Sequence, residues 1–253
     1  MSTISPELPA SQPTSVGANL AGMGSFFIDP AGAARRLPNK WFWVGPLVVF
    51  SIVSFISSYV LLPIVQHVME VMPIPAGIDP DRFQQSMNWS LKIQRAAVYF
   101  TPVITAVIYA VEALVIYASA SVMSLKVTFR QMFNLVAGCS LIQLLSSVAG
   151  VLVLKLKGDV STTAELRPAL GLDIFMPEGA NRFLTAFLGY FSVFEIWWIV
   201  MMALILSVAF RVSKGKALAV MSPWILSELV VPGGCRRIAA NLRTGKAGRS
   251  RLQ

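Results

Sequence analysis

Three polar side chains are the groups that could do chemistry in this chain, because each lies near the centre of a long apolar stretch. They are Glu112, Gln143 and Glu195, and the two glutamates are the charged residues of their stretches. A charged carboxylate at the centre of a bilayer costs at least ~2.5–3.5 kcal/mol by insertion scales, so such residues face other helices and not lipid. We therefore expect the three side chains to form a polar cluster near the membrane midplane, with both carboxylates inside the protein.

Helical spacing places further small or hydroxyl-bearing residues beside these three. They are Thr105, Tyr109 and Ser119 beside Glu112; Ser140, Ser147 and Gly150 beside Gln143; and Ser192 beside Glu195. One interpretation is a proton or cation path, or a groove that binds a polar substrate. The other is hydrogen bonding between helices, worth about 0.6–2 kcal/mol per contact. We favour the second, because transporters are usually built from repeats or paired broken helices, and this sequence shows no internal repeat.

Enzymatic chemistry has little support in the sequence. It contains no Gly-x-Ser-x-Gly elbow, no His-Glu-x-x-His motif and no glycine loop of the kind that cradles phosphate. The single histidine, His67, cannot form a metal site or a catalytic triad, and Cys139 and Cys235 cannot be placed as a disulfide. We predict no catalytic, cofactor-binding or metal-binding residues.

The elements that must position the polar cluster are membrane helices. The four apolar stretches each exceed the ~20 residues that a helix needs to cross the hydrocarbon core of a bilayer. The chain is 55% hydrophobic and only 13% charged. We predict an all-α, polytopic transmembrane helical bundle, with helices at about 42–66, 97–124, 131–154 and 183–210 and a short fifth helix at 217–232. Pro223 and Glu228 interrupt the fifth, so its depth in the membrane stays open.

The ends of the chain are predicted to lie outside the membrane domain of residues 24–232. Residues 1–23 have too little apolar content to order themselves, and no cleavable signal peptide is evident. Asp29-Pro30 starts a short helix at 30–37 that we place on the membrane surface. In the connection 67–95, the stretch from Asp81 to Arg95 is expected to form an amphipathic helical turn or two, and residues 233–253 form a basic tail.

Positive charge predicts the orientation, since short cytoplasmic loops carry an excess of Lys and Arg. The basic residues of the short turns are Arg35, Arg36, Lys40, Lys126, Arg130, Arg211, Lys214 and Lys216. These turns place the N-terminus in the cytoplasm. Together with Arg236 and Arg237 of the tail, they indicate contact with anionic lipid and not with nucleic acid. Charge alone favours four crossings and a re-entrant or surface fifth helix, which would keep the tail inside.

The order and spacing of several short motifs between about residues 25 and 232 resemble the Yip domain family, membrane proteins named for interaction with Ypt/Rab GTPases. The residues that carry the resemblance are Phe27, Asp29, Pro30, Leu37 and Pro38; Thr128, Phe129, Arg130 and Gln131; Phe194, Glu195, Ile196 and Trp197; and Ser213, Lys214, Gly215, Lys216 and Ala217.

The resemblance implies a bundle of five helices with a cytoplasmic N-terminus and, in eukaryotic relatives, a non-enzymatic role in vesicle traffic. The long N-terminal region of those relatives is nearly missing, because only about 40 residues precede the first crossing. We therefore expect no GTPase partner. The compact form resembles the bacterial branch, which implies the bacterial cytoplasmic membrane.

The sequence thus favours a non-enzymatic membrane scaffold or adaptor, whose partner is another membrane protein or a second copy of itself. The alternative is a small transporter or channel component that uses Glu112 and Glu195 as a proton or cation site.

Overall fold

The computed structural model describes residues 16–71, 77, 79–158, 171–175, 188 and 191–227, and these are almost entirely helical. In chain order the helices are α1 (Val16–Ile28), α2 (Pro30–Ala34), α3 (Val44–Val71), α4 (Pro80–Val122), α5 (Phe129–Lys157) and α7 (Val193–Phe210). A 3₁₀ turn, η1 (Leu172–Phe175), precedes α7, and residues 214–227 form a further helix after it. The described residues contain no strand, only an isolated bridge between Gly171 and Ser192.

Four of these helices are long and apolar enough to cross a membrane, which confirms the predicted all-α transmembrane bundle. The candidate spans are Val44–Val68, Arg95–Val122, Phe129–Lys157 and Val193–Phe210. A helix makes all its backbone hydrogen bonds within one segment, so each of these segments can cross the hydrocarbon as a single helix.

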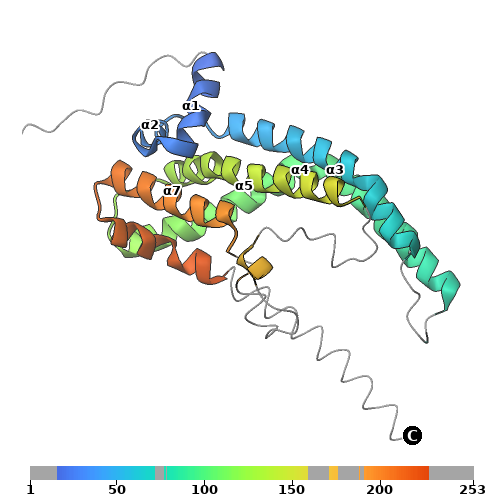
Figure 1. Cartoon of the computed structure of the whole chain (residues 1–253). Helices are drawn as coiled ribbons and strands as arrows, with labels where there is room; N and C mark the ends of the chain where they lie inside the picture. Colours follow the sequence, from blue (N-terminus) through green and yellow to red (C-terminus); the bar gives the residue numbers. More distant parts are fainter. Residues whose placement is uncertain are drawn as a thin grey trace, which may run out of the picture.

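Helix α5 is the centre of the bundle and packs against α1, α3, α4 and α7 (Figure 1). Its first half is buried on every side, from Met132 to Leu144 apart from the partly exposed Phe133 and Gln143. A helix that is apolar all round requires neighbours all round. The segment that precedes α3, which we call the N-terminal segment, covers the part of α5 that the other crossings do not contact.

Helices α1 and α2 form a hairpin within the N-terminal segment, which we call the N-terminal hairpin. Asp29 caps α2 by accepting hydrogen bonds from Ala31 N (3.1 Å) and Gly32 N (2.9 Å), as the sequence predicts. The Phe26 ring is fully buried, stacks on Phe42 at 5.0 Å and lies directly against Gly138 of α5. The hairpin is therefore part of the core.

Two N-terminal predictions need correction. The tail predicted to be disordered up to residue 23 is helical from Val16, while residues 1–15 lie outside the described part. The helix predicted at 30–37 starts at Pro30 but ends at Ala34, and Ala33 and Leu37 are buried. Apolar side chains such as Phe26 find a binding surface on α5 that composition alone does not reveal.

Asn134 fixes the connection between α2 and α3 to the bundle. Its Nδ2 donates to Leu37 O (2.9 Å) and Asn39 O (2.6 Å), and its Oδ1 accepts from Trp43 N (3.2 Å). The side chain is 0% exposed. A buried amide with these partners satisfies backbone groups that no helix satisfies at this turn.

Helix α4 is much longer than the predicted 97–124. It starts at Pro80, where Asp79 caps the helix and accepts from Asp81 N at 3.0 Å. The prediction of only a turn or two in 67–95 is wrong, because Phe83, Met87 and Leu91 recur at helical spacing as a half-buried stripe. Helix α3 likewise extends to Val71 and contains Pro63, whereas α5 extends the predicted 131–154 by only a few residues.

The last predicted crossings also shift. The helix predicted at 183–210 begins only at Val193, where α7 starts, and Phe191 and Ser192 before it are not helical; most of 183–190 lies outside the described residues. The helix predicted at 217–232 starts at residue 214, so it contains Lys214 and Lys216, and it is described to 227. Its Ala217, Val220 and Met221 are buried in the main core. The predicted tail 233–253 lies outside the described residues.

The contact between Phe26 and Gly138 can be tested by substitution. A Cβ atom at Gly138 would overlap the Phe26 ring, so Gly138→Leu should displace the hairpin and cost about 1–3 kcal/mol of stability. Unfolding in detergent and protease sensitivity of the N-terminal segment measure the two effects. Gly24→Ala is the matched control, because a Cβ there has no neighbour within 4 Å. Equal stability of Gly138→Leu and the natural chain would contradict this packing.

Candidate functional site

The clearest polar contact between membrane helices joins α5 to α7. Gln143, at the middle of α5, donates from Nε2 to Glu195 Oε2 at 2.5 Å. Glu195 was predicted at the centre of its helix but lies in the first turn of α7, where its N–H donates to Ser192 Oγ at 3.0 Å. Ser192 caps the N-terminus of α7, so the helix begins just before Glu195. The hydrogen bond to Gln143 places the Glu195 carboxylate level with the middle of α5.

Glu112 faces the interior, as predicted, and is only 7% exposed. Its carboxyl group lies close enough to Tyr109 of α4 and Cys139 of α5 for an electrostatic interaction. Tyr109 is buried between α3 and α5: its ring meets Phe50 edge-on at 5.9 Å, and its hydroxyl lies beside Ser140. Ser140 Oγ donates its own proton to Ala137 O at 2.7 Å, which leaves its lone pairs facing the Tyr109 hydroxyl.

The two acids approach α5 on neighbouring turns. Glu112 lies beside Cys139 and Glu195 bonds to Gln143, and these two α5 residues are four positions apart on one face. We call this arrangement the polar layer: it consists of Thr105, Tyr109, Glu112, Ser140, Gln143 and Glu195. The layer runs from α4 through α5 to α7. Within it, the hydrogen bond between Gln143 and Glu195 joins α5 to α7, and the α4 side chains are buried against α5.

Two other predicted members of the cluster form hydrogen bonds within their own helices. Ser119 Oγ donates to Val115 O (2.9 Å), and Ser147 Oγ donates to Gln143 O (3.2 Å). Among the described residues no group of three His, Cys, Asp or Glu side chains could hold a metal ion.

Two polar contacts escaped the sequence reasoning. Asn134 was overlooked because it lies near the start of its apolar stretch, although a carboxamide among apolar residues is the same signal that singled out Gln143. Trp197 Nε1 donates to Phe27 O at 3.0 Å, 170 residues away in the chain. Nothing local in the sequence predicts that contact.

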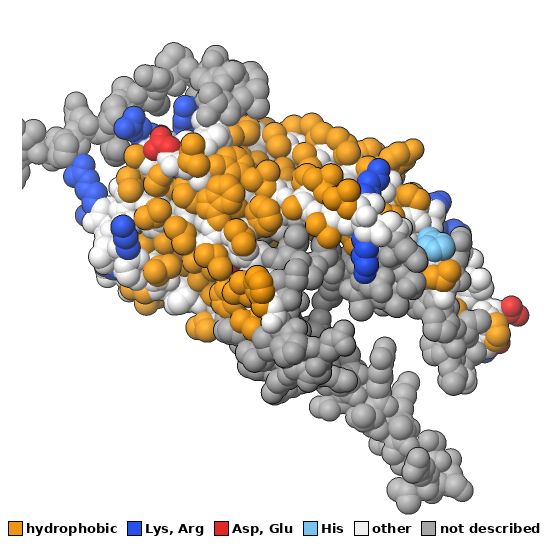
Figure 2. Space-filling view, viewed as in Figure 1, with side chains coloured by type: hydrophobic (Ala, Val, Ile, Leu, Met, Phe, Trp, Pro, Cys, Tyr) orange, Lys and Arg blue, Asp and Glu red, His pale blue; other side chains and the backbone are white. Residues whose placement is uncertain are grey.

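The predicted lipid-contacting residues gather at one end of the bundle, which we call the basic end. The turn after α2, the turn between α4 and α5, and the turn after α7 meet there (Figure 1). Its cationic residues are Arg35, Arg36, Lys40, Lys126, Arg130, Arg211, Lys214 and Lys216, and several Lys and Arg side chains are visible at this end in Figure 2. Arg36 packs over Gly22 of α1, and Lys40 Nζ lies 5.4 Å from the centre of the Trp41 ring. Arg236 and Arg237 lie outside the described residues.

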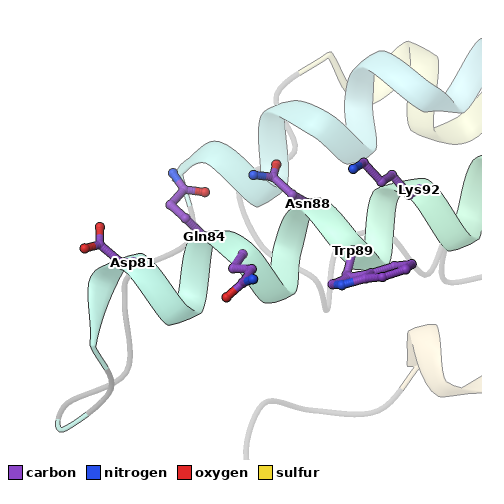
Figure 3. A pocket seen from close by; sticks show the side chains of 6 residues that line it. Asp81, Gln84, Asn88, Trp89 and Lys92 are labelled. Atoms are coloured by element: carbon purple, nitrogen blue, oxygen red, sulfur yellow. The ribbon is translucent and has the colours of Figure 1, made fainter.

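A polar hollow at the opposite end is unrelated to these groups. Its lining residues are Asp81, Gln84, Gln85, Asn88, Trp89 and Lys92 (Figure 3). All of them belong to the first turns of α4, so no second element of the described structure closes the hollow, and none belongs to the polar layer. It is a poor candidate for a binding site.

A family model described as the Yip1 domain matches residues 23–233. The match therefore includes the α1–α2 turn, the polar layer and the basic end, and it agrees with the resemblance read from the short motifs. No curated protein and no solved structure matches the chain.

The Gln143–Glu195 bond can be measured by a double-mutant cycle of Gln143→Leu and Glu195→Leu. Polar contacts between membrane helices contribute about 0.6–1.7 kcal/mol, so we expect a coupling energy in that range. Unfolding of the purified protein in mixed micelles provides the four free energies. A cycle of Gln143→Leu with Ser119→Ala is the control and should be additive, because Ser119 bonds to its own helix. Additivity in both cycles would show that the bond does not join α5 to α7.

Proposed function

The chain belongs to the Yip1 domain family of integral membrane proteins, and we propose that it acts as a non-enzymatic membrane scaffold. Its partner would be another membrane protein or a second copy of itself. We place it in a bacterial cytoplasmic membrane with the N-terminus and the basic end on the cytoplasmic side, because short basic turns favour that side.

The observation that carries this proposal is the use of the polar groups as links between elements. Gln143 binds the Glu195 carboxylate directly, and Asn134 binds backbone groups of the N-terminal segment. In hydrocarbon, such hydrogen bonds hold helices in one arrangement, since apolar side chains gain little by leaving equally apolar lipid. A fixed arrangement suits a protein that presents surfaces to partners.

The basic end supports a second part of the proposal, contact with anionic lipid. Asp29 is the acidic residue of the N-terminal turn, and its carboxylate is already engaged by the amides of α2. Arg35 and Lys40 are exposed beside it. A basic residue at a membrane surface gains about 1 kcal/mol from anionic lipid, so the group favours an anionic leaflet.

A small proton or cation carrier is the second candidate function. The position of Glu112 beside Tyr109 and Cys139, one turn of α5 from the Gln143–Glu195 pair, favours it. Two carboxylates on neighbouring turns could pass a proton between α4 and α7. The scaffold remains the first choice because the Glu195 end of this route is bonded to α5.

Proton flux separates the two candidates. In neutral-lipid vesicles with an imposed pH gradient, we expect the natural chain to dissipate the gradient no faster than protein-free vesicles. Glu112→Gln and Glu195→Gln should behave as the natural chain does and should purify as folded protein. Flux by the natural chain that either substitution abolishes would refute the scaffold and establish the carrier.

Lipid contact is tested by charge removal at the two ends. Arg35→Gln, Arg36→Gln and Lys40→Gln together should lower the enrichment of anionic lipid around the protein several-fold, since ~1 kcal/mol per charge is about fivefold. Energy transfer from Trp residues to labelled anionic lipid in vesicles measures the enrichment. Arg82→Gln, Lys92→Gln and Arg95→Gln remove equal charge at the start of α4 and serve as the control. Equal losses in the two triple variants would contradict a lipid site at the basic end.

A further inference from the structure

Helix α1 runs across the other helices. Figure 1 shows α3, α5 and α7 lying roughly along one direction, whereas α1 approaches them from the side and α2 then turns toward the basic end. If α3, α5 and α7 cross the bilayer, α1 lies close to the plane of the membrane. Its depth in the bilayer then determines whether it is surrounded by headgroups or by acyl chains.

The contacts of the α1–α2 turn show how deep this end of α1 lies. Phe26 packs on Gly138, which lies about nine residues, or roughly 13 Å, along α5 from its start at Phe129. Phe27 O accepts the hydrogen bond from Trp197 of α7, and the Phe27 and Trp197 rings are 5.9 Å apart. The turn therefore lies well inside the length of both helices.

The outer surface near this level is apolar on three of the crossings. On α3, Ile52 lies next to the turn that carries Phe50 and is 55% exposed; on α4, Val111 beside Glu112 is 51% exposed; on α7, Ile196 is 43% exposed. Large apolar side chains that point outward from membrane helices face acyl chains. The α1–α2 turn is consequently at the depth of the hydrocarbon region.

The turn itself suits this depth. Ile28, at the end of α1, is 82% exposed and directly follows Phe27, whose carbonyl oxygen meets Trp197 of α7. Asp29 follows it, and its carboxylate is held by Ala31 N and Gly32 N, which offsets part of the cost of leaving water. In-plane helices typically bury their apolar side ~5–10 Å into the boundary between headgroups and acyl chains.

We propose that α1 and the α1–α2 turn are embedded in one leaflet only, at the basic end, and that they make the protein a wedge. Within the described residues the basic end also holds α2 and the helix 214–227, whereas α3, α4 and the second half of α5 form the opposite end (Figure 1). The partner of this surface is a lipid leaflet. A molecule wider in one leaflet favours a bilayer curved so that this leaflet is on the convex side.

The depth is tested with nitroxide labels on single cysteines in a background with Cys235→Ser, since Cys139 is fully buried. Ile28→Cys is compared with Ile52→Cys, which faces lipid on α3, and with Lys126→Cys, which is exposed in the turn before α5. In neutral-lipid vesicles the label at 28 should match the label at 52, accessible to oxygen and protected from a water-soluble nickel chelate. Chelate accessibility equal to that at 126 would overturn the proposal.

Curvature preference is tested in membrane tubes drawn from giant vesicles. A membrane-impermeant dye on Lys126→Cys marks the molecules whose basic end faces outward, and their density in the tube is compared with that of a lipid dye. The proposal expects a ratio above one for the natural hairpin. A ratio of one or below, with the label at 28 still in lipid, would refute the wedge.

Two variants connect the ratio to the hairpin. Gly138→Leu, which unseats Phe26, should bring the ratio toward one, and Ile28→Asn should do the same without disturbing the packed core. An unchanged ratio in Ile28→Asn would contradict the role of the turn. Because the vesicles are neutral, neither result depends on the proposed contact with anionic lipid.

Discussion

The structure depends on one constraint: a polar group in hydrocarbon must find its partner inside the protein. Helix α5 meets this constraint twice, through Asn134 near its start and Gln143 at its middle. Each carboxamide binds a different element, the N-terminal segment in one case and α7 in the other. The centre of the bundle is therefore defined by hydrogen bonds, while apolar packing of α5 on all sides provides the bulk of the contact.

The same constraint explains how the connection between α2 and α3 is held against the bundle. The chain between α2 and α3 turns back without regular helix, which leaves backbone groups such as Leu37 O and Trp43 N without helical partners. Asn134 supplies those partners, and Phe26 fills the space that Gly138 leaves open. Loss of the Asn134 side chain would leave those backbone groups unpaired, and loss of the Phe26 ring would open a void beside Gly138.

The polar layer has the composition of a transport site and the connections of a structural one. Glu112 and Glu195 carry groups that can take up protons, yet Glu195 is bonded across to Gln143, which joins α7 to α5, and Glu112 is buried in the bundle. The proposed lipid contact of the basic end and the proposed in-plane position of α1 would make the membrane surface the main environment that this protein recognises.

Local patterns in the sequence determined the four apolar helices, the interior position of Glu112 and the start of α2 at Asp29-Pro30, because helix formation and capping depend on neighbours within a few residues. The start of α7 was also within reach, since Ser192 and Glu195 have the spacing of a helix cap. Only the tertiary structure decided that Gln143 bonds to Glu195, that Asn134 holds the N-terminal turn and that Phe27 meets Trp197. Those contacts join residues 52, 95 or 97, and 170 positions apart, and their geometry is set by how the helices pack, a property that no short stretch of sequence contains.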